Sequence, residues 1–161
     1  MTQTVEILAE SSTQLRKVTP EIQARLDSML DVARREIIED GMSNAITERL
    51  AELFLRDFDA VIPALMALIE SGRTAPIIAA ELLKELGRIR DTTSHASRRW
   101  ILEHALNASS PFVRDGAGLG LARLADPAAL RYLRRAIEGE PNAQTRADLQ
   151  LVVDELAETA R

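Results

Sequence analysis

The chain contains 161 residues, carries a formal net charge of −5 and has no cysteine. A chain of this length forms one domain that buries roughly 70% of its unfolded surface, which is enough for a core without covalent cross-links. The absence of cysteine excludes disulfides, thiolate metal sites and thiol catalysis. Aromatic residues make up only 3% of the chain, so the core must be built from aliphatic side chains and alanine.

The N-terminal segment contains neither the basic start nor the apolar run of a signal peptide. No stretch approaches 18 consecutive apolar residues, so the sequence predicts no membrane span. With no sign of export, we expect a cytoplasmic protein.

The N-terminal region predicts a tail and a capping helix. Residues 1–18 are polar and weakly periodic, which indicates a flexible tail. A helix is expected over residues 19–41, because Thr19 and Pro20 favour a helix start and Gly41 favours an end. Apolar residues at three- and four-residue spacing give this helix one buried face: Ile22, Leu26, Met29, Leu30 and Ala33.

Residues 43–72 are expected to form two helices, which make the first pair of an array. Ser43 or Asn44 can cap the first helix, and Asp57 can cap the second. Pro63 lies inside the second helix, where it removes one backbone donor and should bend the helix.

The rest of the chain is expected to form further helical units over about 74–107, 110–139 and 142–159. Gly87 is predicted to end a helix as the residue after the C-cap. No segment alternates with period two, so we predict no strand and about eight helices. The units and their second helices begin at residues that favour helix starts: Thr74, Ser110, Asp126 and Asn142.

Residues 110–130 carry the clearest repeat pattern. They read SPFVRDGAGLGLARLADPAAL, with a Val-Arg pair, small residues one turn later, a Leu-Ala-x-Leu motif and an Asp-Pro dipeptide. Similar motifs occur at residues 86–91 (LGRIRD) and 143–149 (AQTRADL). Helix starts recur at intervals of 36 residues, from Thr74 to Ser110, and 32 residues, from Ser110 to Asn142. Such spacing is typical of arrays of helix pairs.

This pattern resembles the bacterial HEAT repeat over about residues 44–158. The resemblance implies an all-α fold, a right-handed α–α superhelix in which the second helix of each pair lines the concave surface. It also implies structural contacts between neighbouring repeats, pairing Arg114 with Asp91 and Arg146 with Asp126. The motif is specific for fold and says little about function.

Small residues are concentrated in the helix that begins at Ser110. Gly116, Ala117, Gly118 and Gly120 would allow two helices to approach where larger side chains would clash. The same glycines do not predict a phosphate-binding loop, because they follow no strand and no Gly-Lys-Ser/Thr motif is present.

No combination of residues predicts a catalytic centre, a metal site or a bound cofactor. His95 and His104 are nine residues apart, whereas metal ligands on one helix face are spaced by three or four. A serine nucleophile needs a base and an orienting acid, and the serines here lie at or near helix starts, where capping explains most of them. We therefore expect no enzymatic activity, although repeats of this type also occur in bilin-attachment lyases.

The repeat alignment predicts a partner-binding ridge along the second helices. At about 100° per residue, Trp100 lies nearly opposite the buried face of its helix, and His104 lies one turn further on the same side. Trp100 could instead pack against helix 20–38 or fill a gap between repeats, and the arginines could form an ordinary solvated face. The complete ridge contains Ile62, Met66, Arg99, Trp100, His104, Arg131, Arg134 and Arg135.

The ridge favours a non-catalytic module that binds a protein partner, because Trp and Arg are enriched at interface hot spots. The alternative is nucleic-acid binding through residues 84–135, which hold 10 Lys and Arg against 5 Asp and Glu. The acidic overall balance and the scarcity of aromatic residues argue against it. Exposed Ile62 and Met66 would also permit homodimerisation.

Overall fold

The computed structural model describes residues 20–35, 44–72 and 74–159, and every regular element in these ranges is helical. The all-α prediction is therefore confirmed for this part of the chain. The predicted tail 1–18 and the predicted helix end at Gly41 lie outside the described residues. The elements are α2 (Pro20–Arg35), α3 (Asn44–Glu70), α4 (Pro76–Arg88), α5 (His95–Ala105), α6 (Pro111–Leu124), the 3-10 turn η1 (Pro127–Ala129), α7 (Leu130–Gly139) and α8 (Ala143–Thr159).

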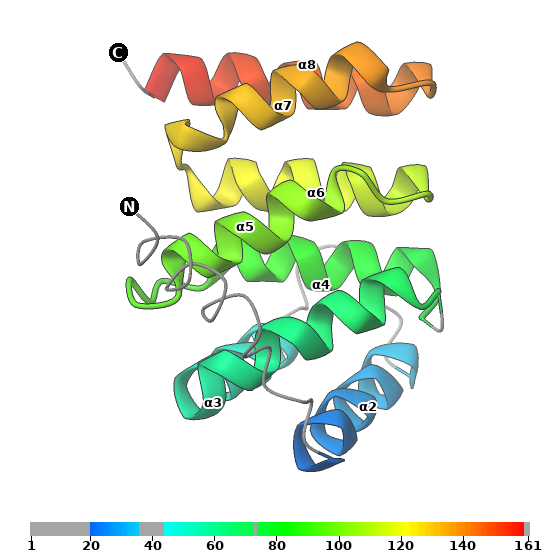
Figure 1. Ribbon diagram of the computed structural model, residues 1–161, viewed down its shortest axis with the longest axis vertical. Helices are drawn as coiled ribbons and strands as arrows, with labels where there is room; N and C mark the ends of the chain where they lie inside the picture. Colours follow the sequence, from blue (N-terminus) through cyan, green and yellow to red (C-terminus); the bar gives the residue numbers. More distant parts are fainter. Residues whose placement is uncertain (1–19, 36–43, 73, 160–161) are drawn as a thin grey trace, which may run out of the picture.

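The helices form two layers. Figure 1 shows α3, α5 and α7 in front of α4, α6 and α8, with α2 beside α3 at the lower end. In the rear layer α4 packs on α6 and α6 packs on α8, while α5 and α7 each pack back onto this layer. None of the described helices is both long and apolar enough to cross a membrane.

Of the predicted helix starts, Asp126 and Asn142 cap with their side chains. Ser110 is an N-cap without a side-chain hydrogen bond, and the N-cap of α4 is Ala75 and not Thr74. The Asp126 carboxylate accepts a hydrogen bond from the Ala128 N–H at 2.9 Å. The Asn142 side chain accepts two, from the N–H groups of Gln144 and Thr145, each at 3.0 Å. These bonds satisfy N–H groups that have no partner within the first turn of a helix.

The predicted break between two helices near Asp57 is wrong. Residues 44–70 form one helix of 27 residues that continues through Pro63. The segment before Pro63 contains no glycine or other proline, so nothing in the backbone stops the helix there. An aspartate that can cap a helix can also lie inside one, and the local sequence does not distinguish the two.

Close packing between α4 and α6 depends on glycines, which have no side chain to keep the two helices apart. A Cβ added to Gly116 would lie 2.6 Å from the Ala80 Cα, and one added to Gly120 would lie 2.5 Å from the Leu83 carbonyl oxygen. The predicted close approach is confirmed at both positions. Gly118 instead makes room for the Leu149 side chain of α8.

Gly87 has a different role from the one predicted. The helix continues past it to Arg88, and the C-cap is Ile89 in an extended conformation. Gly87 lies against the backbone of Gly120, where an added Cβ would overlap the carbonyl oxygen. It is therefore a helix-packing glycine and not the end of α4.

Candidate functional site

The exposed side of α5 carries two stacked rings. Trp100 is 50% exposed, although it is the largest apolar side chain in the chain. Its ring centroid lies 5.6 Å from that of His104, with an angle of 28° between the planes. The His104 Nε2 atom lies 3.1 Å from a Glu70 carboxylate oxygen, which links this pair to the end of α3. The rings therefore form a fixed aromatic platform on the surface.

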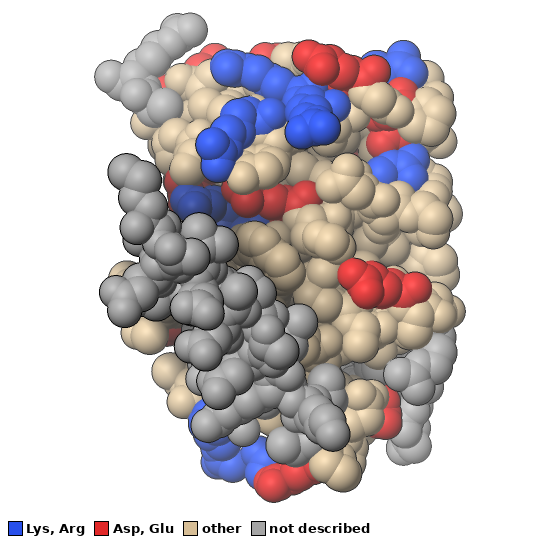
Figure 2. All heavy atoms as spheres, viewed as in Figure 1, with Lys and Arg blue, Asp and Glu red and all other residues tan. Residues whose placement is uncertain are grey.

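The exposed side of α7 is basic. Only Leu133 is fully buried in this ten-residue helix, while Arg131, Arg134 and Arg135 are exposed. The Arg131 guanidinium lies over the Tyr132 ring, 4.6 Å from its centroid, and donates a hydrogen bond to the Tyr132 hydroxyl at 2.8 Å. Figure 2 shows Lys and Arg side chains gathered over α7 in the upper part of this view, with acidic side chains just below.

A groove of about 550 Å³ separates α5 from α7. Its floor contains Glu103, which is 8% exposed and lies 3.4 Å from the Arg99 Nε atom. Burial raises the pKa of Glu103, and the nearby charge of Asp126 adds to this, while Arg99 and Arg131 act in the opposite direction. The groove is lined by Glu103, Leu106, Asn107, Ala108, Arg114, Tyr132, Arg135, Ala136, Gly139, Glu140 and Pro141.

We refer to Trp100, His104, Arg131, Tyr132 and Arg135 as the α5–α7 face. Of these residues, Tyr132 and Arg135 line the groove, and the Arg131 charge affects the pKa of Glu103 on its floor. His104 lies instead at a separate pocket of about 300 Å³, together with Ile69 and Glu70 of α3. The face therefore combines an aromatic pair next to the end of α3 with a groove where Tyr132 and Arg135 lie near a recessed carboxylate. Such a surface can bind another molecule through stacking, burial and ion pairing.

The predicted ridge is present only in part. Arg99 is held internally, because its guanidinium donates to the Asp126 carboxylate at 2.7 Å. Ile62 is half-buried, and Met66 is only 8% exposed and belongs to the core. The alignment placed Met66 at the surface because it treated residues 59–70 as a separate second helix. In the continuous α3 this turn packs against other helices, so the homodimer contact through Met66 is not available.

The predicted arginine–aspartate pairs are also different. Arg114 binds Glu140 through two hydrogen bonds of 2.6 Å, and the Arg146 guanidinium donates to the Glu140 carbonyl oxygen. Asp91 accepts instead from the N–H of Ser94 at 2.7 Å, within its own turn. The short aspartate side chain reaches the N–H groups that follow it more easily than an arginine in another repeat.

Asp126 links the turn before η1 to α5, and not to Arg146. Its carboxylate contacts both Arg99 and the Nε2 atom of His95, which lies 2.9 Å away. The four residues predicted to connect repeats thus all hold turns, but with other partners. Sequence reasoning missed Glu140, and its position next to Pro141 in a turn was the only available signal.

Three turn carboxylates have lowered pKa values. The Ser94 hydroxyl and N–H lower the pKa of Asp91 to about 2. The Arg114 side chain lowers the pKa of Glu140. Burial acts to raise the pKa of Asp126, but hydrogen bonds from Ala128, His95 and Arg99 outweigh it and lower the pKa.

These shifts predict a loss of stability in acid. A carboxylate with a lowered pKa in the folded state stabilises the fold above its unfolded pKa, and this contribution is lost as the pH falls through the folded value. The free energy of unfolding should therefore decrease from about pH 4 towards pH 2. Glu103, with its raised pKa, acts in the opposite sense, because the penalty for its buried charge is relieved as the pH falls through its folded pKa. Urea unfolding followed by circular dichroism at each pH would measure the dependence.

Glu140→Gln should reduce the steepness of this acid loss, because the group that titrates against Arg114 is removed. Glu138→Gln is the matched control, since Glu138 is exposed on the same helix end. Equal acid dependence in the Glu140→Gln variant and the parent would contradict the assignment.

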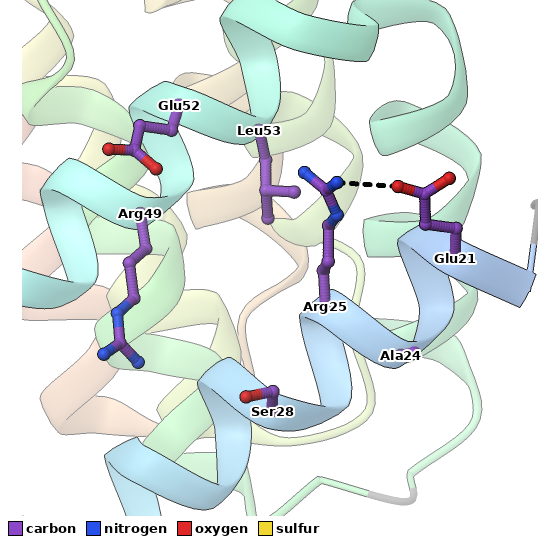
Figure 3. Close-up of a pocket in the computed structure, with 7 residues that line it drawn as sticks. All are labelled: Glu21, Ala24, Arg25, Ser28, Arg49, Glu52 and Leu53. Carbon is purple, nitrogen blue, oxygen red and sulfur yellow. Dashed lines mark hydrogen bonds and ion pairs between the residues drawn. The ribbon is translucent and has the colours of Figure 1, made fainter.

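A second groove, of about 440 Å³, lies between α2 and α3 and is lined by Glu21, Ala24, Arg25, Ser28, Arg49, Glu52 and Leu53. Arg25 is already paired with Glu21 at 2.6 Å. Figure 3 shows Arg25 turned towards Glu21, while the charged groups of Arg49 and Glu52 do not converge on it. This groove therefore offers no focused set of functional groups.

Neither histidine belongs to a metal-binding cluster in the described part of the chain. No group of three or more His, Asp or Glu side chains there is placed to hold a metal ion. The Ser94 hydroxyl, which precedes His95, accepts a hydrogen bond from the buried Arg98 at 2.9 Å. It is therefore engaged in the turn and not positioned by a histidine base.

Comparisons of the chain with known protein families, with curated proteins and with solved structures found no match.

Proposed function

We propose that this chain is a HEAT-like, non-catalytic interaction module that binds a protein partner in the cytoplasm through the α5–α7 face. The single observation that carries the proposal is the half-exposed Trp100, stacked on His104 in the same helix layer as the exposed arginines of α7. Exposing this much indole to water is unfavourable unless a partner covers it. In the proposed right-handed superhelix, α3, α5 and α7 are the second helices of successive pairs.

The composition of the face fits a protein interface. Trp, Tyr and Arg are the residues most enriched at hot spots, where a few side chains supply most of the binding energy. Here Tyr132 and Arg135 line one groove, which can receive a side chain of the partner, and Arg131 rests on the Tyr132 ring. The outward cations of α7 favour a partner surface that carries acidic residues.

Nucleic-acid binding is less well supported, because internal contacts use most of the basic residues of segment 84–135. Arg98 is buried and donates to two backbone carbonyl oxygens. Ion pairs within the protein engage Lys84, Arg88, Arg99, Arg114 and Arg123. The cations left facing outwards on α7 are too few for the extended basic surface that a nucleic-acid backbone requires.

Affinity capture from cells of the native host tests the proposal. Trp100→Ala and Arg131→Glu should each reduce recovery of the partner at least tenfold, because truncating a hot-spot residue costs about 2 kcal/mol or more. Arg49→Glu, an equal charge change at an exposed position of α3, should have no effect. Nuclease treatment should leave recovery unchanged. The proposal fails if both variants fold and recover the same proteins as the parent.

A further inference from the structure

The rear layer has an exposed apolar surface of its own. Phe112 and Leu119 of α6 are 61% and 37% exposed, and Leu151 of α8 is 66% exposed. These side chains lie on the sides of α6 and α8 that face away from the core. Exposed large apolar residues that gather on neighbouring helices are typical of interaction sites.

A shallow groove connects these residues. One part, of about 200 Å³, lies between Phe112 and Asp115 of α6 and Gln144 and Asp148 of α8. The next part, of about 280 Å³, is lined by Asp115, Leu119, Asp148, Leu151, Val152 and Glu155. Both parts share Asp115 and Asp148, so they form one continuous depression. We call it the α6–α8 groove and define it by Phe112, Asp115, Leu119, Asp148, Leu151 and Glu155.

The centre of the groove is negative. Asp115 has no ion-pair partner among the described residues, and the nearest cation on α4, Lys84, is paired with Glu81. Partial burial raises the pKa of Asp115, and the neighbouring charge of Asp148 raises it further. The Lys84 charge acts on the pKa of Asp115 in the opposite direction. A further cation placed between Asp115 and Asp148 would stabilise the charged form of Asp115.

We propose that the α6–α8 groove docks a basic amphipathic helix of a protein partner, with a Lys or Arg between Asp115 and Asp148 and apolar side chains on Phe112 and Leu119. The spacing fits this occupant. Phe112 and Leu119 are seven residues apart on α6, about 10.5 Å along the axis, which is two helical turns. An amphipathic helix presents apolar anchors at the same interval, with its cations between them.

A second copy of this chain fits the groove less well. Within the described part of the chain, α7 carries three exposed arginines and Tyr132 but offers no exposed aliphatic anchor. Docking α7 of one copy on the groove of the next would join different surfaces and build open chains. The groove lies on the other helix layer from the α5–α7 face, so this inference does not depend on the proposed function.

A defined probe can test the groove without knowledge of the natural partner. The probe is a synthetic 15-residue helical peptide with leucines seven residues apart and lysines between them, and its control carries glutamate in place of lysine. Both are titrated into the ¹⁵N-labelled full-length chain. Shifts of backbone NMR signals should concentrate in α6 and α8 with the lysine peptide and be absent with the glutamate peptide.

Two double variants separate the groove from general acidity. Asp115→Asn with Asp148→Asn should weaken binding of the lysine peptide at least tenfold. Asp154→Asn with Glu158→Gln makes the same charge change at exposed positions of α8 outside the groove, and should alter the affinity less than twofold. Leu119→Ser should weaken binding while leaving the charge unchanged.

Three results would overturn the proposal. One is equal affinity of the two double variants for the lysine peptide. Another is a set of NMR shifts located on other helices. The third is a mass in sedimentation that grows with protein concentration and is restored to the monomer by Asp115→Asn with Asp148→Asn, which would assign the groove to a second copy.

Discussion

Gly87→Ala is expected to destabilise the fold by about 3 kcal/mol, since overpacking of a tight interface costs about 1–3 kcal/mol and occasionally more. The added methyl group would overlap the backbone carbonyl of Gly120, which cannot rotate away as a side chain could. Alanine has the higher helix propensity by about 1 kcal/mol, but this gain is smaller than the cost of separating α4 from α6. Urea or thermal unfolding followed by circular dichroism would measure the loss.

Gly139→Ala is the matched control for this prediction. Gly139 is also helical, but no atom lies within 4 Å of the position of an added Cβ and its φ is not positive. Its replacement should change the free energy of unfolding by less than about 1 kcal/mol. If the two variants were equally stable, the α4–α6 contact could not be as close as the structure has it.

The glycines also show where sequence reasoning was sufficient and where it was not. Clustered small residues in residues 116–120 predict close helix packing, and the structure confirms it at Gly116 and Gly120. Gly87 follows the same principle, but it stands alone near a helix end. A capping glycine and a packing glycine look alike in sequence, because the neighbour that distinguishes them, here Gly120, lies on another helix.

Local signals predicted the turns better than the contacts between helices. Asp126 and Asn142 start helices because their side chains reach N–H groups two or three residues away, which depends on sequence alone. The partners of Arg114 and Asp126 depend on how helices distant in sequence pack together. A chain position that lies one repeat away in sequence can be out of reach in space, as Arg114 and Asp91 illustrate.

Residues of the candidate site were predicted correctly where the exposure of a side chain depends only on which face of its own helix it occupies. The helical angle placed Trp100 opposite the buried side of α5, and its exposure agrees with that. The same reasoning failed at Met66, because α3 is longer than expected and is covered by other helices. Tyr132 was overlooked, although it supplies the ring on which Arg131 rests.

Arg98→Met is expected to destabilise the fold by about 3–4 kcal/mol, because buried polar groups left without partners cost about 1–3 kcal/mol each. Arg98 is only 1% exposed and ties the connector after α4 to α5. Its guanidinium donates to the Leu86 carbonyl at 2.9 Å, the Asp91 carbonyl at 2.5 Å and the Ser94 hydroxyl at 2.9 Å. Methionine matches the length and apolar stem of arginine but leaves all three acceptors unpaired.

Two further measurements identify this loss as a loss of hydrogen bonds. Arg98→Lys keeps the charge but cannot reach three acceptors that lie in different directions, so it should remain less stable than the parent. Limited proteolysis of Arg98→Met should cut first between residues 89 and 94, because the connector is the part that Arg98 holds.

Burial lowers the pKa of Arg98 and the Asp91 charge raises it. The Arg98 side chain thus stays buried because its hydrogen-bond acceptors surround it. If the free energy of unfolding of Arg98→Met were within about 1 kcal/mol of that of the parent, water could replace the guanidinium at these acceptors.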